Sequence, residues 1–179
     1  MDFLLRQMDK TAAAIGASFV INCGDNFYKG GSAHDGVTGT TDSQWQTVYE
    51  NIYNGPYLSN PDIKWYSVLG NHDYGLAKSP LYEIQYSLQN LGTGRWYMPD
   101  HNFTVIKTIP NSGGATLQFV FFDTQRIAIS ETSNTMTGGV NPVTLAQCNA
   151  QLQWLASTLA SSTATWLFVI GHYHGRWLV

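Results

Sequence analysis

Trp65-Tyr66-Ser67-Val68-Leu69 runs directly into Gly70-Asn71-His72-Asp73, so an apolar, strand-like run ends in a short polar loop. Runs rich in β-branched and aromatic residues suit buried strands. The same join occurs twice more, at Phe19-Val20-Ile21 before Gly24-Asp25-Asn26-Phe27-Tyr28 and at Trp166-Leu167-Phe168-Val169-Ile170 before Gly171-His172-Tyr173-His174. In an open α/β sheet, sites form at the carboxyl ends of strands. The three joins therefore predict an α/β fold whose polar loops meet at one site.

Helical periodicity alternates with these strands along the chain. Apolar spacing predicts helices within residues 3–15, 45–52, 79–89 and 143–159. Gly16 is expected to end the first helix. Residues 103–109 and 116–122 flank a Pro-Asn-Ser-Gly-Gly turn and predict a β-hairpin, whereas the polar segment 125–142 predicts a long surface loop. No internal repeat or linker interrupts the pattern, so residues 1–179 are predicted to form one domain.

The composition restricts the class of protein. A chain of 179 residues with 44% hydrophobic residues suffices for a packed core. A net charge of -3 with only 12% charged residues offers no basic surface, so we expect no nucleic-acid partner. No window approaches the ~20 apolar residues of a membrane span. Charged residues interrupt the apolar amino terminus, so no signal peptide is predicted in this chain. Cys23 and Cys148 fit neither a disulfide scaffold nor a zinc cluster, and Cys23 is expected to be a buried structural thiol.

Both ends of the sequence are unusual for a whole domain. The first predicted helix has no preceding strand, and the last apolar strand and its loop are followed only by Arg176-Trp177-Leu178-Val179. A domain seldom ends on an aromatic and two aliphatic residues directly after a site loop. We therefore expect the chain to be a fragment of a domain, incomplete at both ends.

Asp25 and Tyr28 form the first candidate pair. Asp25 follows a glycine on a tight turn, where its two oxygens can bridge two cations, and Tyr28 lies three residues on, within reach of the same ion. The alternative is that Asp25 caps a turn and Tyr28 belongs to the core, and for an isolated motif of this kind that alternative is favoured.

The second and third loops add imidazole and amide groups. Asn71 offers a carbonyl ligand, while His72 can donate to a phosphate oxygen or a leaving group. His172 can supply an imidazole to a second cation. Asp73 is expected to orient His72 by a hydrogen bond, with a structural cap as a nearly equal alternative. Mixed oxygen and imidazole donors suit two catalytic metal ions better than a single-metal cage.

These motifs resemble those of the purple acid phosphatases, closest to the small tartrate-resistant type, within the calcineurin-like metallophosphoesterases. The resemblance covers nearly the whole chain and includes Arg95-Trp96-Tyr97-Met98-Pro99, Phe122-Asp123-Thr124 and Gln151-Leu152-Gln153-Trp154-Leu155. It implies an α/β/β/α sandwich of mixed sheets. By the same likeness, Asp25 bridges a ferric and a divalent ion, Tyr28 binds the ferric ion, and Asn71 and His172 bind the divalent ion. His72 contacts phosphate without binding metal. Iron, zinc and manganese all tolerate this divalent donor set.

Two departures from the family pattern concern the metal ligands. No Asp-x-Gly loop precedes Asp25, although the family uses one to supply a ferric ligand. Gly171-His172-Tyr173-His174 matches the family's terminal Gly-His-x-His motif, but residues 169–173 also match the preceding Val-x-x-His motif. We prefer the second placement, because the predicted helix just before it belongs to that placement. His174 then stands where close relatives commonly have proline, and its role stays open.

The resemblance implies an acid phosphatase that hydrolyses phosphate monoesters with a metal-activated hydroxide. The expected substrate is a small phosphomonoester or a phosphoprotein, the expected state is a monomer, and the expected location is secreted or lysosomal or vacuolar. Two alternatives stay open: a phosphodiesterase or nucleotide hydrolase using the same metals, and a non-catalytic scaffold protein of the same fold.

Overall fold

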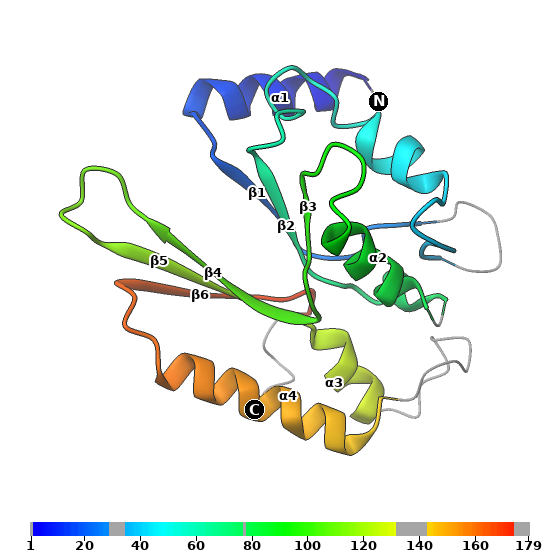
Figure 1. Cartoon of the computed structure of the whole chain (residues 1–179), viewed down its shortest axis with the longest axis vertical. Helices are drawn as coiled ribbons and strands as arrows, with labels where there is room; N and C mark the ends of the chain where they lie inside the picture. Colours follow the sequence, from blue (N-terminus) through cyan, green and yellow to red (C-terminus); the bar gives the residue numbers. More distant parts are fainter. Residues whose placement is uncertain (1, 29–34, 77, 132–142, 174–179) are drawn as a thin grey trace.

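The computed structural model describes residues 2–28, 35–76, 78–131 and 143–173 (Figure 1). His174 and the last five residues, on which part of the sequence interpretation rests, lie outside these ranges. Helices and strands alternate along the described chain. In order they are α1 (Asp2–Ile15), β1 (Phe19–Asn22), η1 (Trp45–Glu50), β2 (Lys64–Ser67), η2 (His72–Tyr74), α2 (Ser79–Leu88), β3 (Trp96–Tyr97), β4 (Asn102–Thr108), β5 (Thr116–Phe122), α3 (Thr124–Glu131), α4 (Leu145–Ala160) and β6 (Trp166–Ile170).

The strands form two sheets of three strands each. The first sheet has the order β1-β2-β3 and is parallel, with Phe19 opposite Lys64 and Trp65 opposite Trp96. The second has the order β4-β5-β6, in which β4 and β5 form the predicted antiparallel hairpin and β6 runs parallel to β5. Mixed pairing thus occurs in the second sheet. The carboxyl ends of β1, β2 and β6 carry the three polar loops, as the sequence predicted.

The two sheets pack face to face, and helices cover their outer faces (Figure 1). Successive residues of a strand point to opposite faces. On β5, Phe121 contacts Tyr66 of the first sheet at a ring-centre distance of 5.8 Å, whereas Val120 packs with residues of α3 and α4. On β2, the residue before Tyr66 is Trp65, whose side chain lies on the opposite face and contacts Tyr49 of η1. These layers confirm the predicted α/β sandwich.

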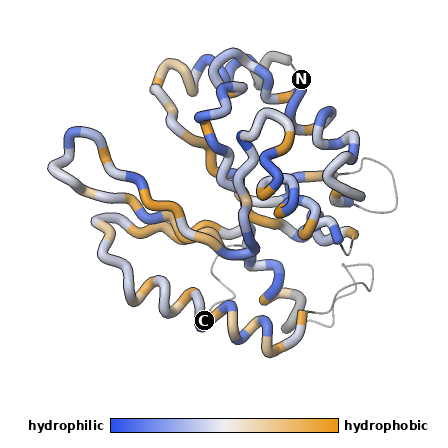
Figure 2. Tube along the Cα trace, in the orientation of Figure 1, coloured by the Kyte–Doolittle hydropathy of each residue, from blue (hydrophilic) through white to orange (hydrophobic). Residues whose placement is uncertain are grey.

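Local sequence explains several element boundaries. Gly16 adopts a φ of 62° and its amide bonds to the Ala13 carbonyl, so it ends α1 as predicted. Thr144 and Gln147 form a reciprocal capping box at the start of α4. Figure 2 shows hydrophobic residues along β5 and β6. None of the described helices is long and apolar enough to cross a membrane.

Two predicted elements differ in the structure. The helix expected within residues 45–52 is a six-residue π-helix, η1. Trp45 and Tyr49, four residues apart on it, both contact Trp96, at ring-centre distances of 5.3 and 5.2 Å. The prediction of a surface loop for residues 125–142 is wrong for the first of these residues, where α3 forms. Asp123 accepts hydrogen bonds from the first amides of α3, and the buried Ile127 packs against the second sheet. Residues 132–142 lie outside the described ranges.

Candidate metal centre

The loops after β1 and β2 meet backbone to backbone. A side chain at Gly24 would come within 2.7 Å of the Gly70 nitrogen, and one at Gly70 would collide with the backbone of Asp25. Gly24 also has a φ of 90°, which favours glycine. Asp25 itself has a φ of 57°, an unusual conformation for a residue with a side chain. Two glycines and one strained aspartate therefore bring the carboxylate of Asp25 onto the loop of the next strand.

The Asp25 carboxylate is shared by three neighbours. Its Oδ1 accepts a hydrogen bond from the His72 amide at 3.0 Å and lies 3.4 Å from Nε2 of His172. Its Oδ2 accepts a hydrogen bond from the Tyr28 hydroxyl at 2.5 Å. Asp25 thus stands between one group from each of three segments that are far apart in sequence.

His172 aims a ring nitrogen at the oxygens of Asn71 and Asp25. Its Nδ1 lies 2.9 Å from the Cys23 carbonyl, which can only accept, so a neutral ring carries its proton on Nδ1. Its Nε2 then presents a lone pair to Oδ1 of Asn71 at 3.1 Å and to Oδ1 of Asp25. Three acceptors that face one another are satisfied by a cation between them, so this donor set fits a divalent metal ion.

Tyr28 lies on the other side of Asp25. It is 49% exposed, so the alternative that placed it in the core is wrong. The partial burial of Tyr28 still raises the pKa of the phenol well above its ordinary value, and the hydrogen bond to Asp25 and that carboxylate's charge raise it further. The phenol is therefore protonated in these surroundings, and a strongly charged cation is what would convert it into an anionic ligand.

No group of three or more His, Cys, Asp and Glu side chains gathers in metal-binding geometry among the described residues. The reason is the composition of the candidate centre, which relies on an amide and a phenol beside one carboxylate and one imidazole. Those are the four candidate metal ligands that the sequence predicted: Asp25, Tyr28, Asn71 and His172. The structure brings all four together.

His72 is held by Asp35, a residue that the sequence analysis missed. Its Nδ1 lies 2.5 Å from Oδ2 of Asp35, while its Nε2 lies 3.9 Å from Oδ2 of Asp25. The His72 ring also packs on the Tyr28 ring, with centres 4.3 Å apart. Because the ionised Asp35 carboxylate can only accept, it places the His72 proton on Nδ1 and leaves Nε2 available to a substrate.

The position of Asp35 is fixed by close backbone packing. A side chain at Gly75 would lie 2.5 Å from the Asp35 carbonyl oxygen, and the next residue, Gly36, has a φ of 88° and bonds to the Phe27 carbonyl. In the sequence, Asp35 is one polar residue in a Gly- and Thr-rich stretch. Only an Asp-Gly turn pair marks it, and this pair carries no information about a partner 37 residues away.

Asp73 has a structural role instead of the predicted contact with the His72 ring. Its carboxylate accepts hydrogen bonds from the amides of Asn26 at 2.8 Å, Phe27 at 3.1 Å and Gly70 at 2.8 Å. The expectation that Asp73 orients His72 is therefore wrong, and the structural alternative holds. Burial raises the pKa of Asp73 to about 7, and the charge of Asp25 adds to the rise.

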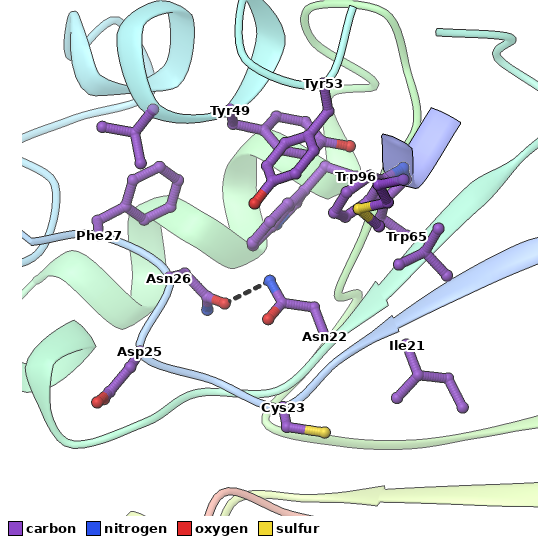
Figure 3. Close-up of a pocket in the computed structure, with 13 residues that line it drawn as sticks. Ile21, Asn22, Cys23, Asp25, Asn26, Phe27, Tyr49, Tyr53, Trp65 and Trp96 are labelled. Carbon is purple, nitrogen blue, oxygen red and sulfur yellow. Dashed lines mark hydrogen bonds between the residues drawn. The ribbon is translucent and has the colours of Figure 1, made fainter. Parts of the chain in front are cut away.

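Cys23 is exposed, so the prediction of a buried structural thiol is wrong for it, whereas Cys148 is buried. Cys23 and Asp25 also border a cavity of about 430 Å³ along β1 (Figure 3). The far wall of the cavity is aromatic and includes Tyr49, Trp65 and Trp96. The cavity therefore adjoins the candidate metal centre on the β1 side.

Comparisons with known proteins identify the family of the chain. The family model described as "Calcineurin-like phosphoesterase" matches residues 1–176. Tartrate-resistant acid phosphatase type 5 of Sus scrofa is 29% identical over 91% of this chain and 44% of its own length. Purple acid phosphatase 3 of Arabidopsis thaliana is 33% identical over 93% of this chain and 42% of its own length.

The fold also has a counterpart among solved structures. The structure described as "GAP50 the anchor in the inner membrane complex of Plasmodium" is similar with a TM-score of 0.66 and 20% identity, over 93% of this chain and 48% of that one. The chain spans less than half the length of these relatives. From the match over nearly all of its residues, the chain belongs to the calcineurin-like phosphoesterase family.

Proposed function

We propose that this protein is an acid phosphatase, a binuclear-metal hydrolase that cleaves phosphate monoesters. The observation that carries the proposal is the convergence of Asp25, Asn71 and His172 on one point, with Tyr28 on the other oxygen of Asp25. The relatives named as acid phosphatases support the reaction class. The family to which the chain belongs implies a binuclear metal centre.

The donor set divides between two positions. Asp25, Asn71 and His172 would hold a divalent ion, for which iron, zinc and manganese are candidates. Asp25 and Tyr28 would belong to a ferric position. When bound, such a pair of cations clamps the phosphate and supplies a hydroxide nucleophile at moderate pH.

His72 is the proposed catalytic side chain. Its Nδ1 contacts Asp35, so Nε2 lies on the side of Asp25, and the ring packs on Tyr28. In this orientation a protonated His72 can donate to a phosphoryl oxygen or to the departing alkoxide. Its distance of 3.9 Å from Asp25 keeps it beside the metal ligands without joining them.

The substrate class follows from the same proposal. A small phosphomonoester or a phosphoprotein would present a terminal phosphate to the centre, and we expect a monomeric, secreted or lysosomal or vacuolar enzyme without a nucleic-acid partner. The net charge of -3 gives little attraction to a polyanion.

Metal analysis combined with kinetics tests the roles. Asn71→Ala and His172→Ala are expected to lower divalent-metal content. His72→Ala is expected to keep both metals and lose about 10²-fold or more in kcat, the usual size of a general-acid or charge-stabilising contribution. Gln153→Ala, at an exposed position of α4, is the control. Loss of a metal from His72→Ala would refute its proposed role.

A paired substrate assay tests the reaction class. Hydrolysis of 4-nitrophenyl phosphate should exceed that of bis(4-nitrophenyl) phosphate with the same metal-loaded preparation. Faster diester cleavage would replace the proposal by a phosphodiesterase. Full metal content with neither activity would favour the non-catalytic alternative.

A further inference from the structure

The candidate centre joins loops from both sheets, and few contacts hold those loops together directly. His172, after β6, reaches the first sheet through the Cys23 carbonyl at 2.9 Å and through the Asn71 amide oxygen at 3.1 Å. The second of these contacts involves two proposed metal ligands. The aromatic core joins the two sheets, and a further connection close to the loops would fix their alignment.

Asp123 provides such a connection at the end of β5. Its side chain is fully buried. Oδ2 accepts a hydrogen bond from the Tyr74 hydroxyl at 2.5 Å and one from Nδ1 of His101 at 2.9 Å. Oδ1 accepts the amides of Gln125 and Arg126 at the start of α3. One carboxylate thus connects η2, the residue before β4 and α3.

Both loops of the candidate centre are attached to this junction. Tyr74 lies two residues after His72 in η2. Thr124, the residue after Asp123, accepts a hydrogen bond from the Tyr173 amide at 3.0 Å. A side chain at Gly171 would lie 2.6 Å from the Thr124 methyl group, so the backbone before His172 rests directly on Thr124. The helix η2, which begins at His72, is therefore bound to Asp123, and the loop that carries His172 is bound to the adjacent Thr124.

The chemistry of the junction favours a fixed orientation. Burial raises the pKa of Tyr74 well above its ordinary value, and the charge of Asp123 adds to the rise, so Tyr74 stays a donor. The carboxylate requires that His101 donate from Nδ1. Four other charged groups of the described chain act near this network. Asp100 accepts the His101 amide, Arg126 and Asp73 act on Tyr74 through their charges, and the charge of Asp123 acts on Glu83.

We infer that Tyr74, Asp123 and His101 form a positioning network that holds His72 and His172 in register across the two sheets. The network contacts neither substrate nor metal, and its effect on turnover rests on the proposed phosphatase function. Its effect on the geometry of the divalent position does not depend on that function.

The test removes single hydrogen bonds from the network. Tyr74→Phe deletes only the hydroxyl, and Tyr49→Phe is the matched control because the buried Tyr49 hydroxyl has no hydrogen-bond partner among the described residues. Nitrogen-15 NMR of the imidazoles follows His101, calorimetry measures Zn²⁺ binding, and kcat is measured on 4-nitrophenyl phosphate. A second pair compares His101→Leu with His101→Asn, whose amide can replace the Nδ1 donor.

In Tyr74→Phe the His101 imidazole should keep its proton on Nδ1, because the Asp123 carboxylate can still accept from it. Zn²⁺ affinity and kcat should each fall by up to about 10-fold, at or below the usual cost of losing a partner of a metal ligand, because the network lies one contact further out. His101→Asn should recover most of the loss seen in His101→Leu, and Tyr49→Phe should change none of these quantities.

Unchanged Zn²⁺ affinity in a folded Tyr74→Phe protein would overturn the inference, whether or not His101 shifts, and so would an equal loss in Tyr49→Phe. The outcomes also separate the two proposals. If Zn²⁺ affinity falls as expected while even the unaltered protein lacks phosphatase activity, the positioning network stands and the phosphatase proposal fails.

Discussion

Single side chains decide the candidate ferric position, because Tyr28 and Asp25 are its two proposed protein ligands in the described chain. The Tyr28 hydroxyl bonds to Asp25 at 2.5 Å, and the pKa of Tyr28 is raised, first by burial. A phenol in this state binds Fe(III) only by losing its proton. Metal loading should therefore change the Tyr28 spectrum.

Tyr28→Phe is expected to remove the visible absorption of the iron-loaded protein, since a tyrosinate bound to ferric iron gives a charge-transfer band. Absorption spectra during Fe(III) addition measure this directly. Tyr82→Phe, on α2, is the control and should keep the band. A band that survives in Tyr28→Phe would exclude Tyr28 as the ligand.

Asp35→Asn tests the orientation of His72. The amide removes the negative charge that faces the Nδ1 proton, so the doubly protonated ring that donates from Nε2 is favoured less. We expect kcat to fall about 10- to 100-fold with little change in KM, because the substrate still binds while its proton donor is weakened. Asp35→Glu keeps a carboxylate and should recover part of the loss. Wild-type kinetics in Asp35→Asn would show that the 2.5 Å contact does not serve the reaction.

At the scale of elements, buried polar groups join η2 and α2 to the loop after β1. The side-chain nitrogen of Asn26 donates to Glu83 at 2.9 Å, to Asp73 at 3.1 Å and to the Val68 carbonyl at 3.0 Å. Glu83 and Asp73 are both fully buried, and burial is the main cause of the raised pKa of each carboxyl. The loop after β1 thus rests on two buried acids with raised pKa values, and the amides that donate to Asp73 offset part of the rise at that residue.

This pair predicts that stability falls as pH rises. In the unfolded chain the carboxyls of Asp and Glu titrate near pH 4, whereas in the fold the pKa of Asp73 is about 7 and that of Glu83 is also raised. Above about pH 4 the folded protein therefore binds more protons than the unfolded chain. The stabilisation that these protons provide is lost as pH rises through the pKa values of the folded state.

Glu83→Gln should relieve part of this loss, because the amide stays neutral and can still accept from Asn26. The melting temperature of Glu83→Gln relative to the unaltered protein should increase between about pH 5 and pH 8. Calorimetry with a chelator present measures the difference without metal binding. Asp62→Asn, an exposed change of the same charge, is the control. A difference that does not vary with pH would contradict the role given to the Glu83 proton.

At the scale of the whole molecule, β6 is an edge strand that exposes apolar side chains. Trp166 is 59% exposed, Phe168 42% and Val169 47%, and β6 pairs with β5 on one side only within the described chain. Unpaired backbone groups beside apolar side chains are a template for pairing with another chain. The monomer proposed for the enzyme is therefore not expected of the 179-residue chain by itself, which should self-associate through β6.

Trp166→Lys should weaken this association, because a charge on an edge strand opposes pairing. Ile106→Lys is the matched control, since Ile106 is 61% exposed on β4, the other edge of the same sheet. Sedimentation velocity across a concentration series measures the effect. Equal behaviour of the two variants, or a monodisperse unaltered chain, would show that β6 is not the contact.

The sequence by itself determined the elements whose signals are local. Helical spacing of apolar residues, a glycine at a helix end and a Gly-rich turn predicted α1, α2, α4 and the β4–β5 hairpin. The four candidate ligands were named from short motifs that follow apolar strands and from the resemblance of those motifs to the purple acid phosphatases.

Only the tertiary structure decided which side chains meet. Asp35 contacts a histidine 37 residues away, Asp73 braces two loops, and Asp123 joins the two sheets. The same holds for α3, whose polar sequence becomes a helix because Asp123 caps it and Ile127 finds a core. Such contacts depend on the packing of distant segments, and a short polar residue looks alike in sequence whether it caps a turn, orients a histidine or crosses between sheets.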